Sequence, residues 1–239
     1  MKYWNFKGQQ NTICEALQVS LPEHAVISVV GAGGKTSLIF AWARELASEG
    51  KSVCITTTTH MAANQCDFLE SDISVIVRPD PDNPDKVIGP AIEEIVNLKT
   101  QYDVVLIEAD GARRQALKWP KEHEPVVPEI TDISICVAGL SSLGRPLQDA
   151  LYNAEGLPQA MERDIVDEAL IAAIVSSPDG GLKGTYGDYR VFLNQADTKE
   201  LQEKATYIQA LLAVRGIQSA WAKLISLGKT TPFLKSGRR

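Results

Sequence analysis

Short apolar runs, rich in β-branched residues, alternate along the chain with segments of helical periodicity. Most of the runs are continuous rather than alternating, which is typical of strands buried on both faces of a parallel sheet. The predicted strands are Ala25 to Val30, Ser52 to Thr57, Ile73 to Val77, Asp103 to Glu108, Asp132 to Ala138, Tyr189 to Leu193 and Gln218 to Leu224.

Between the strands, apolar residues recur with the spacing of one helix face. Thr12 and Glu15 form a capping-box pattern that predicts a short helix before the first strand. The predicted stripes are Leu38, Ile39, Trp42, Ala43 and Leu46; Val87, Ile88, Ala91, Ile92, Ile95 and Val96; Ile165, Val166, Ala169, Leu170 and Ala173; and Ala205, Ile208, Leu211 and Leu212.

This alternation predicts an α/β fold with a mostly parallel sheet flanked by helices on both faces. We expect residues 1–239 to form a single domain, with a small helical insertion around residues 140–170. Long irregular stretches run from Arg78 to Lys86, from Asp110 to Ile130 and from Gly139 to Gly156. Such loops in an α/β domain are usually functional.

Composition narrows the class of protein. The 239 residues are 44% hydrophobic and 23% charged, as in ordinary globular proteins, and the formal net charge is −6. An acidic chain lacks the basic balance of a general nucleic-acid or membrane binder, so neither is expected as a partner. Four cysteines without a CxxC pair, and an amino-terminal segment without an apolar core, favour a soluble cytoplasmic protein with reduced thiols.

The strongest chemical signal is VISVVGAGGKTS, residues 26–37, where a strand meets a glycine cluster and then an amphipathic helix. Glycines let backbone N–H groups surround phosphate oxygens, and a helix amino terminus adds its dipole. The usual phosphate-loop pattern has glycine where this chain has Val29. We expect Lys35 to face solvent and reach the phosphates, and Thr36 to ligate Mg²⁺. The predicted nucleotide-binding residues are Gly31, Ala32, Gly33, Gly34, Lys35, Thr36 and Ser37.

The second predicted strand ends in CITTTTHM. Its threonines lie on the ligand side of a parallel sheet, so Thr57, Thr58 or Thr59 can contact Mg²⁺ or a phosphate, with His60 facing the substrate. Threonine is also a good strand former, and that alternative stays open.

A third signal is VVLIEADGARR, an apolar strand that ends in Glu108, Asp110 and Gly111. Nucleoside triphosphatases place a carboxylate there to hold Mg²⁺, and a following glycine admits the γ-phosphate. We predict catalytic roles for Lys35, Glu108, Asp110 and Arg113, and metal contacts from Thr36, Glu108 and Asp110. Arg114 is a further anion contact. The alternative is a charged strand end that caps the next helix.

YRVFLNQADTKE is another strand, and it ends in a pattern similar to the N-K-x-D motif of GTPases. Asp197 would accept two N–H bonds from guanine, a donor pair that adenine lacks. Asn194 would tie this segment to the glycine loop, while Gln195 replaces the usual lysine. Asp197 with Glu200 also fits a helix capping box, which is the competing interpretation.

Together these motifs resemble two kinds of protein. Glutamate at the second motif resembles the GTPases that assemble metal centres. The resemblance to the YqeC family is closer, and it rests on VVGAGGKTS, ITTTTHM, IEADGARRQALKWPKEHEPVVP, GLSSLGRPL and LNQADT. That resemblance implies a P-loop nucleotide-binding protein that serves as an accessory factor of selenium-dependent molybdenum hydroxylases. The implied partners are such a hydroxylase or the proteins that mature its cofactor.

Three functions remain open at this point. The leading one is a Mg²⁺-dependent NTP hydrolase, with GTP favoured over ATP. The second is a small-molecule kinase whose acceptor is held by Arg113, Arg114 and the loop of Lys118, Lys121, His123 and Glu124. The third is a nucleotide-binding scaffold without turnover. Arg145 is a further anion contact or a surface residue.

Overall fold

The computed structural model describes residues 2–63 and 72–224 and centres on a nine-stranded sheet. Seven of its strands are parallel, and they are, across the sheet, β14 (Gln218–Ala222), β13 (Asp188–Asn194), β11 (Ile133–Gly139), β3 (Ala25–Gly31), β9 (Val104–Glu108), β4 (Val53–Thr57) and β6 (Ile73–Val75). The hairpin of β1 (Tyr3–Asn5) and β2 (Gly8–Gln10) adds two antiparallel strands beside β14.

All seven strands predicted from apolar runs are present, with ends that coincide with the predicted ones or differ by at most two residues. The central strands β3, β9, β4 and β11 are buried along their whole length, as continuous apolar runs require. β3 pairs with β9 so that Val29 lies opposite Glu108. This register places the end of the glycine segment beside the acidic strand end.

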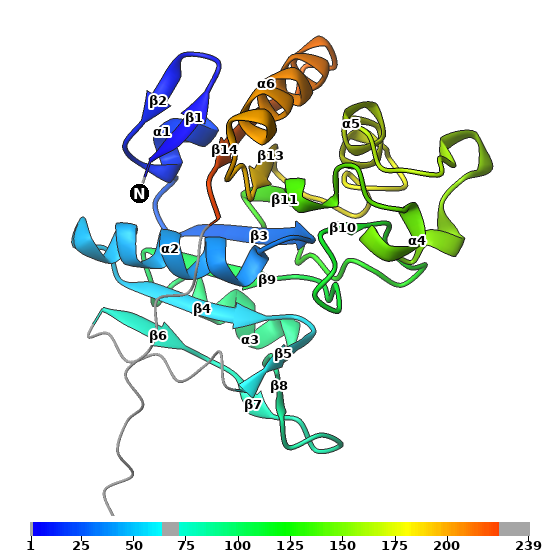
Figure 1. Cartoon of the computed structure of the whole chain (residues 1–239). Helices are drawn as coiled ribbons and strands as arrows, with labels where there is room; N and C mark the ends of the chain where they lie inside the picture. The colour runs from blue at the N-terminus through cyan, green and yellow to red at the C-terminus, as the bar shows by residue number, and fades with distance from the viewer. Residues whose placement is uncertain (1, 64–71, 225–239) are drawn as a thin grey trace, which may run out of the picture.

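Helices cover both faces of the sheet (Figure 1). α1 (Ile13–Leu17) and α2 (Lys35–Ser48) pack on one face, where Phe40 and Trp42 are fully buried. α3 (Ile92–Leu98), α5 (Glu168–Ser176) and α6 (Lys199–Val214) pack on the other face. Burying an aromatic side chain of this size contributes about 2–3 kcal/mol. The chain therefore has the predicted α/β fold, with a glycine loop between β3 and α2, as in P-loop NTPases.

Two predicted helical stripes start too early. Val87 and Ile88 belong to β8 (Lys86–Ile88), because Gly89 and Pro90 follow them and α3 begins only at Ile92. Ile165 and Val166 precede α5, whose N-cap is Asp167; its side chain accepts a hydrogen bond from the N–H of Leu170. The capping box of Thr12 and Glu15 is confirmed at the start of α1.

Two small sheets follow the carboxyl ends of the central strands. β5 (His60–Ala62), β8 and β7 (Arg78–Pro79) form an antiparallel sheet after β4, at the lower end of Figure 1. β10 (Leu117–Lys118), after β9, pairs with β12 (Leu151–Tyr152). Residues 140–161 hold α4 (Leu147–Ala150) and short 3₁₀ turns at Leu140–Ser142, Ala154–Gly156 and Gln159–Met161.

Cys54 and Cys136 are buried free thiols, and Cys14 is half-buried and also free. Cys66 lies outside the described residues. Within residues 2–63 and 72–224, no helix has the length and apolar character needed to cross a membrane.

Candidate functional site

The glycine loop (residues 31–34) fits tightly against the ends of two neighbouring strands. Gly33 and Gly34 have φ of 83° and 121°, a region that side chains rarely adopt. A Cβ at Gly33 would lie 2.3 Å from the Gly139 nitrogen, and one at Gly34 would lie 2.2 Å from Asn194 Nδ2. Only glycine fits at these two positions, so the loop is held close to β11 and β13.

Helix α2 begins directly after this loop and presents unbonded donors. Gly34 is its N-cap, and in the described part of the chain the N–H groups of Lys35, Thr36 and Ser37 have no acceptor. Such a helix amino terminus, with its partial positive charge, binds anions. By contrast, Gly31 donates to Asp110 Oδ2 at 3.0 Å and Ala32 to the Val137 carbonyl at 2.9 Å.

The prediction that Lys35 faces solvent is wrong. Its side chain is 4% exposed, because it curls back over the loop toward the end of β9. Nζ donates to the Gly31 carbonyl at 2.7 Å and lies 3.0 Å from Asp110 Oδ1. Burial lowers the pKa of Lys35, but the neighbouring charges of Asp110 and Glu108 outweigh it, so the pKa is raised overall. The lysine is therefore a buried, charged group.

Glu108 and Thr36 meet beside the start of α2. Thr36 Oγ1 donates to Glu108 Oε2 at 2.6 Å, and Glu108 Oε1 lies 3.9 Å from Lys35 Nζ. Burial raises the pKa of Glu108 and the charge of Asp110 adds to this, while Lys35 and the Thr36 hydroxyl act against it. The two side chains thus bring a hydroxyl and a carboxylate oxygen to one point.

Asp110 is buried between two cations. Besides Lys35, the ammonium of Lys118 lies 3.1 Å from its Oδ2. Lys118 also lies 2.9 Å from Glu124 Oε2 and donates to the Gly111 carbonyl. Its side chain is 1% exposed and belongs to β10, although Lys118 was predicted to lie on a loop. The available signal was its position between the apolar Leu117 and Trp119.

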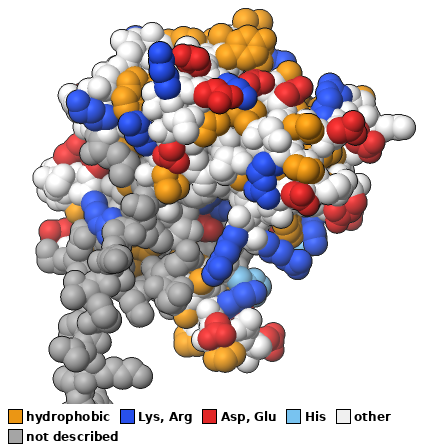
Figure 2. Space-filling model, in the orientation of Figure 1, with side chains coloured by type: hydrophobic (Ala, Val, Ile, Leu, Met, Phe, Trp, Pro, Cys, Tyr) orange, Lys and Arg blue, Asp and Glu red, His pale blue; other side chains and the backbone are white. Residues whose placement is uncertain are grey.

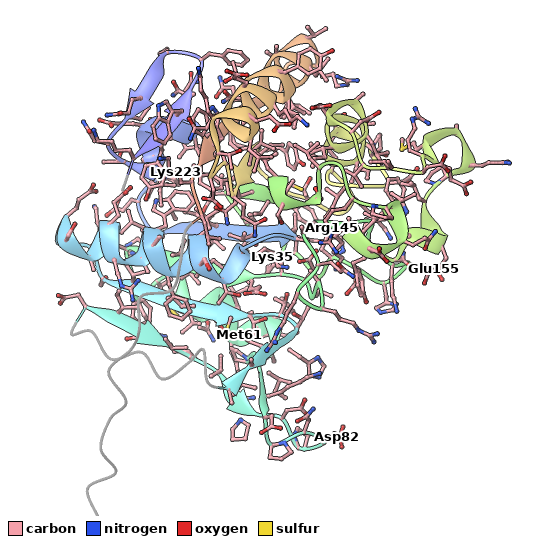
Figure 3. All side chains as sticks on the ribbon, in the orientation of Figure 1. Lys35, Met61, Asp82, Arg145, Glu155 and Lys223 are labelled. Atoms are coloured by element: carbon pink, nitrogen blue, oxygen red, sulfur yellow. The ribbon has the colours of Figure 1, made fainter. Side chains whose placement is uncertain are left out.

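A cleft of about 940 Å³ opens over the start of α2, a size suited to a small-molecule ligand. Its floor includes residues 33–37 and Glu108, and its walls come from the small sheet, the segment after β9 and the insertion. Figure 3 labels Lys35, Met61 and Arg145 around this region. The charged residues that line it are Lys35, Arg44, Lys86, Arg113, Arg114, Arg145, Glu108 and Glu124. Cations predominate, so the cleft favours an anionic ligand.

A turn after β9 carries two of these arginines. Arg113 and Arg114 have φ of 45° and 64°, and the N–H of Gln115 donates to the Ala112 carbonyl at 2.9 Å. Positive φ at both central positions suits glycine or asparagine, and costs other residues about 1–2 kcal/mol each. The turn therefore carries two long cationic side chains at positions where the backbone conformation disfavours them.

The threonine run divides into structural and cleft-lining residues. Thr57 Oγ1 donates to the Glu108 carbonyl at 2.7 Å, and Thr58 Oγ1 to the Val126 carbonyl at 2.6 Å. Thr59 and His60 line the cleft. His60 Nε2 lies 3.4 Å from Oδ2 of the buried Asp80, which was not singled out from the sequence.

The NQAD segment lies only partly at the cleft. Asn194 Nδ2 donates to the Gly33 carbonyl at 2.9 Å, the expected tie to the glycine loop, and Gln195 lines the cleft. Asp197 is exposed and accepts a hydrogen bond from the N–H of Leu224 at 2.7 Å. The capping interpretation is wrong, because Thr198 is the N-cap of α6. Lys121 and the exposed His123 do not line this cleft.

No group of three or more His, Cys, Asp or Glu side chains gathers at a potential metal site within the described ranges. Thr36 and Glu108 each bring an oxygen atom to the cleft, and oxygen is the ligand type that Mg²⁺ takes.

Comparison with known proteins gives a family and a relative. A family model described as "YqeC protein" matches residues 27–155, a range that includes the glycine loop, Glu108, Asp110 and Arg145. A curated protein of Escherichia coli (strain K12), described as "Uncharacterized protein YqeC", is 42% identical over 223 residues. The match covers 82% of this chain and 86% of that protein.

Solved structures show only distant likeness. FlhF complexed with GMPPNP and Mg²⁺ matches with a TM-score of 0.49 and 13% identity, covering 91% of this chain and 72% of FlhF. FtsY from Mycoplasma mycoides matches with a TM-score of 0.36 and 16% identity, covering 87% and 54%. The strand order of the sheet and the placement of the helices on its two faces define the fold.

Proposed function

The chain belongs to the YqeC family, and from the chemistry of its cleft we propose that it binds a Mg²⁺-nucleoside triphosphate and hydrolyses it. One observation carries this proposal: the unbonded N–H groups at the start of α2 and the Lys35 ammonium lie at the floor of a cation-lined cleft. Donors fixed in this way suit the oxygens of a triphosphate.

The residues present fit a Mg²⁺ ion. Thr36 and Glu108 already bring two oxygen atoms within 2.6 Å of each other, and both line the cleft. They would hold the ion, which supplies charge neutralisation for the phosphates when bound. Asp110 was predicted as a third ligand, but its oxygens face Lys35 and Lys118. We therefore assign it to the positioning of these two lysines.

The chain's own groups account for hydrolysis largely by positioning and by neutralising charge. Lys35 would exchange Asp110 for phosphate oxygens, and the N–H groups of Thr36 and Ser37 would bind the same phosphates. Glu108 would orient the attacking water as well as contact the ion. Arg113, on the turn over the cleft, would neutralise charge on the transferred phosphoryl group.

For the base, we propose that guanine is preferred to adenine. The support is the N-Q-A-D sequence at the end of β13 and the hydrogen bond from Asn194 to the glycine loop. Asp197 is exposed and does not cap α6, and among the described residues only its Oδ1 has a hydrogen-bond partner, so Oδ2 would be available to a ligand.

In the cell, we propose that the nucleotide cycle serves the maturation of a selenium-dependent molybdenum hydroxylase. The family resemblance is the source of this role. The partner would be the hydroxylase or a protein that matures its cofactor, and the protein would act as a cytoplasmic accessory factor.

Phosphate release tests the hydrolysis. Purified protein is incubated with Mg²⁺ and either GTP or ATP, and released phosphate is measured with Glu108→Gln as the matched variant. We expect GTP-dependent release that Glu108→Gln reduces at least about tenfold. Intact nucleotide that stays bound would show a scaffold, and transfer only to an added acceptor would show a kinase.

A further inference from the structure

Four cations on the cleft walls have no carboxylate partner among the described residues. They are Lys86, Arg113, Arg114 and Arg145, and none lies within ion-pair distance of an Asp or Glu. By contrast, Lys35 and Lys118 are fully paired in the interior. Figure 2 shows Lys and Arg side chains gathered beside a histidine on the face toward the viewer.

A Mg²⁺-triphosphate accounts for only one of these four cations, because Arg113 would neutralise charge on its transferred phosphoryl group. Its phosphates have Lys35 and the start of α2 as partners at the floor of the cleft, and the ion neutralises part of their charge. Among the described residues, the wall cations Lys86, Arg114 and Arg145 then remain without a carboxylate partner. A chain of net charge −6 that keeps unpaired cations around one concavity favours a further anion there.

One wall is a face of the small sheet. β5 pairs with β8 so that Ala62 lies opposite Lys86 and His60 opposite Ile88. His60 and Ala62 are two residues apart on one strand, so His60 and Lys86 project from the same face as diagonal neighbours. The buried Asp80 contacts His60 at Nε2, and within residues 2–63 and 72–224 Nδ1 has no hydrogen-bond partner, so it is left for a ligand.

The other wall is the turn of Arg113 and Arg114. Positive φ at both positions places adjacent side chains on a tight bend that glycine would form more easily. Backbone strain of this kind is found at functional sites, where it is kept because it aims a side chain. Arg114 has no hydrogen bond or ion pair within the described residues, so its guanidinium is available to a ligand.

We propose that the cleft binds a second anion beside the nucleotide, between the face of the small sheet that carries His60 and Lys86 and the turn that carries Arg114. The ligand is a phosphate group, either free or carried on a small molecule. Lysine, histidine and arginine arranged around one space suit a multiply charged tetrahedral oxyanion. The inference rests on the proposed function, since it assigns the floor of the cleft to the nucleotide.

Equilibrium dialysis of the full chain tests this site. The protein is saturated with Mg²⁺ and a non-hydrolysable GTP analogue, whose binding is measured separately, and labelled inorganic phosphate or glycerol 3-phosphate is added. The variants are Lys86→Ala and Arg114→Ala. Their controls are Lys51→Ala and Arg215→Ala, which remove exposed cations outside the cleft.

We expect saturable binding near one molecule per chain, weakened at least about tenfold in each wall variant and unchanged in the controls. Tighter binding of glycerol 3-phosphate identifies a phosphorylated small molecule, and tighter binding of phosphate identifies the free ion. Absence of saturable binding, or equal affinity in the wall variants and the native chain, overturns the site.

Failure of the nucleotide proposal gives a different result. If the analogue does not bind, dialysis is repeated without it, with Lys35→Ala added to the variants. Phosphate binding that is lost in Lys86→Ala and Arg114→Ala but kept in Lys35→Ala supports the second site. Binding that is lost only in Lys35→Ala overturns it.

Discussion

The ammonium of Lys35 lies 3.0 Å from Asp110 Oδ1, and both side chains are shielded from solvent. A buried lysine needs a partner because an unpaired charge in the interior is costly. Here Asp110 and Glu108 are the carboxylate partners of Lys35. Phosphate oxygens would therefore compete with two carboxylates for the same cation.

Replacing Lys35 with alanine should destabilise the fold as well as remove a phosphate contact. Glu108 and Asp110 would lose their shared cation, and breaking a buried pair costs about 3–5 kcal/mol. The pKa of Glu108, already raised by burial, would rise further, so protonation should recover part of the loss at pH 5. Urea unfolding at pH 7 and pH 5 measures this, with Lys51→Ala as control. Unchanged stability at pH 7 would contradict the burial of a charged lysine.

Lys118 and Glu124 should be coupled energetically. The Lys118 ammonium contacts Asp110 and Glu124 at 3.1 and 2.9 Å in a nearly dry environment. We expect Lys118→Met and Glu124→Gln each to lower the free energy of unfolding, and the double variant to lose at least about 1 kcal/mol less than the sum. A double-mutant cycle by urea unfolding measures this coupling. Strict additivity would show that the pair does not interact.

Mg²⁺ should matter for nucleotide binding through Glu108. At a hundredfold excess over Kd, bound Mg²⁺-nucleotide should stabilise the native chain by about 2.7 kcal/mol. Glu108→Gln keeps an acceptor for the Thr36 hydroxyl but removes the negative charge. It should therefore reduce the part of the stabilisation by nucleotide that depends on Mg²⁺. Thermal unfolding of the native chain and of Glu108→Gln with GTP, in the presence of either Mg²⁺ or EDTA, measures this difference. Equal shifts under both conditions in both proteins would exclude the metal role.

Glu45 on α2 should make stability depend on pH. Burial raises the pKa of Glu45 from 4.5 to about 7, although its Oε1 accepts a hydrogen bond from the Ile13 N–H at 2.7 Å. The folded chain thus holds this proton more tightly than the unfolded chain. The contribution of this proton to the free energy of unfolding is fully present below pH 4.5 and is lost as the pH rises through 7.

The matched variant for this effect is Glu45→Gln, which stays neutral and keeps the acceptor. Relative to the native chain, it should gain on the order of 2 kcal/mol in the free energy of unfolding between pH 4.5 and pH 8. Urea unfolding at both pH values gives the difference. If the difference in the free energy of unfolding between Glu45→Gln and the native chain is the same at pH 4.5 and at pH 8, the raised pKa of Glu45 is contradicted.

The sequence predicted the central sheet well because its strands are buried on both faces, so their apolar runs are unbroken. The run from Val104 to Glu108 is an example. It did not predict β1, β2 or the small sheets, whose two- or three-residue strands depend on pairing rather than on pattern. The spacing of Val87 and Ile88 predicted a helix, but both residues lie in a strand that pairs with β5.

At the site, the sequence predicted which residue types are present, but it did not predict which of their side chains are buried. Glycines before Lys35 and Thr36 implied a loop and a helix start, and both are present. That Lys35 is buried follows from Asp110 folding against Gly31, a contact between residues 79 positions apart. Likewise, the structural role of Lys118 depends on Glu124 and Asp110 meeting it in space, which spacing along the chain does not reveal.

Calorimetric titration of the full chain with Mg²⁺-GTP and with Mg²⁺-ATP tests the central claim most directly, because binding at the start of α2 precedes every other proposed step. The account predicts one nucleotide per chain, tighter binding of GTP than of ATP, and at least about a hundredfold loss of affinity in folded Lys35→Ala with none in Lys51→Ala. Absence of binding by the native chain, or equal affinity in Lys35→Ala, would contradict it.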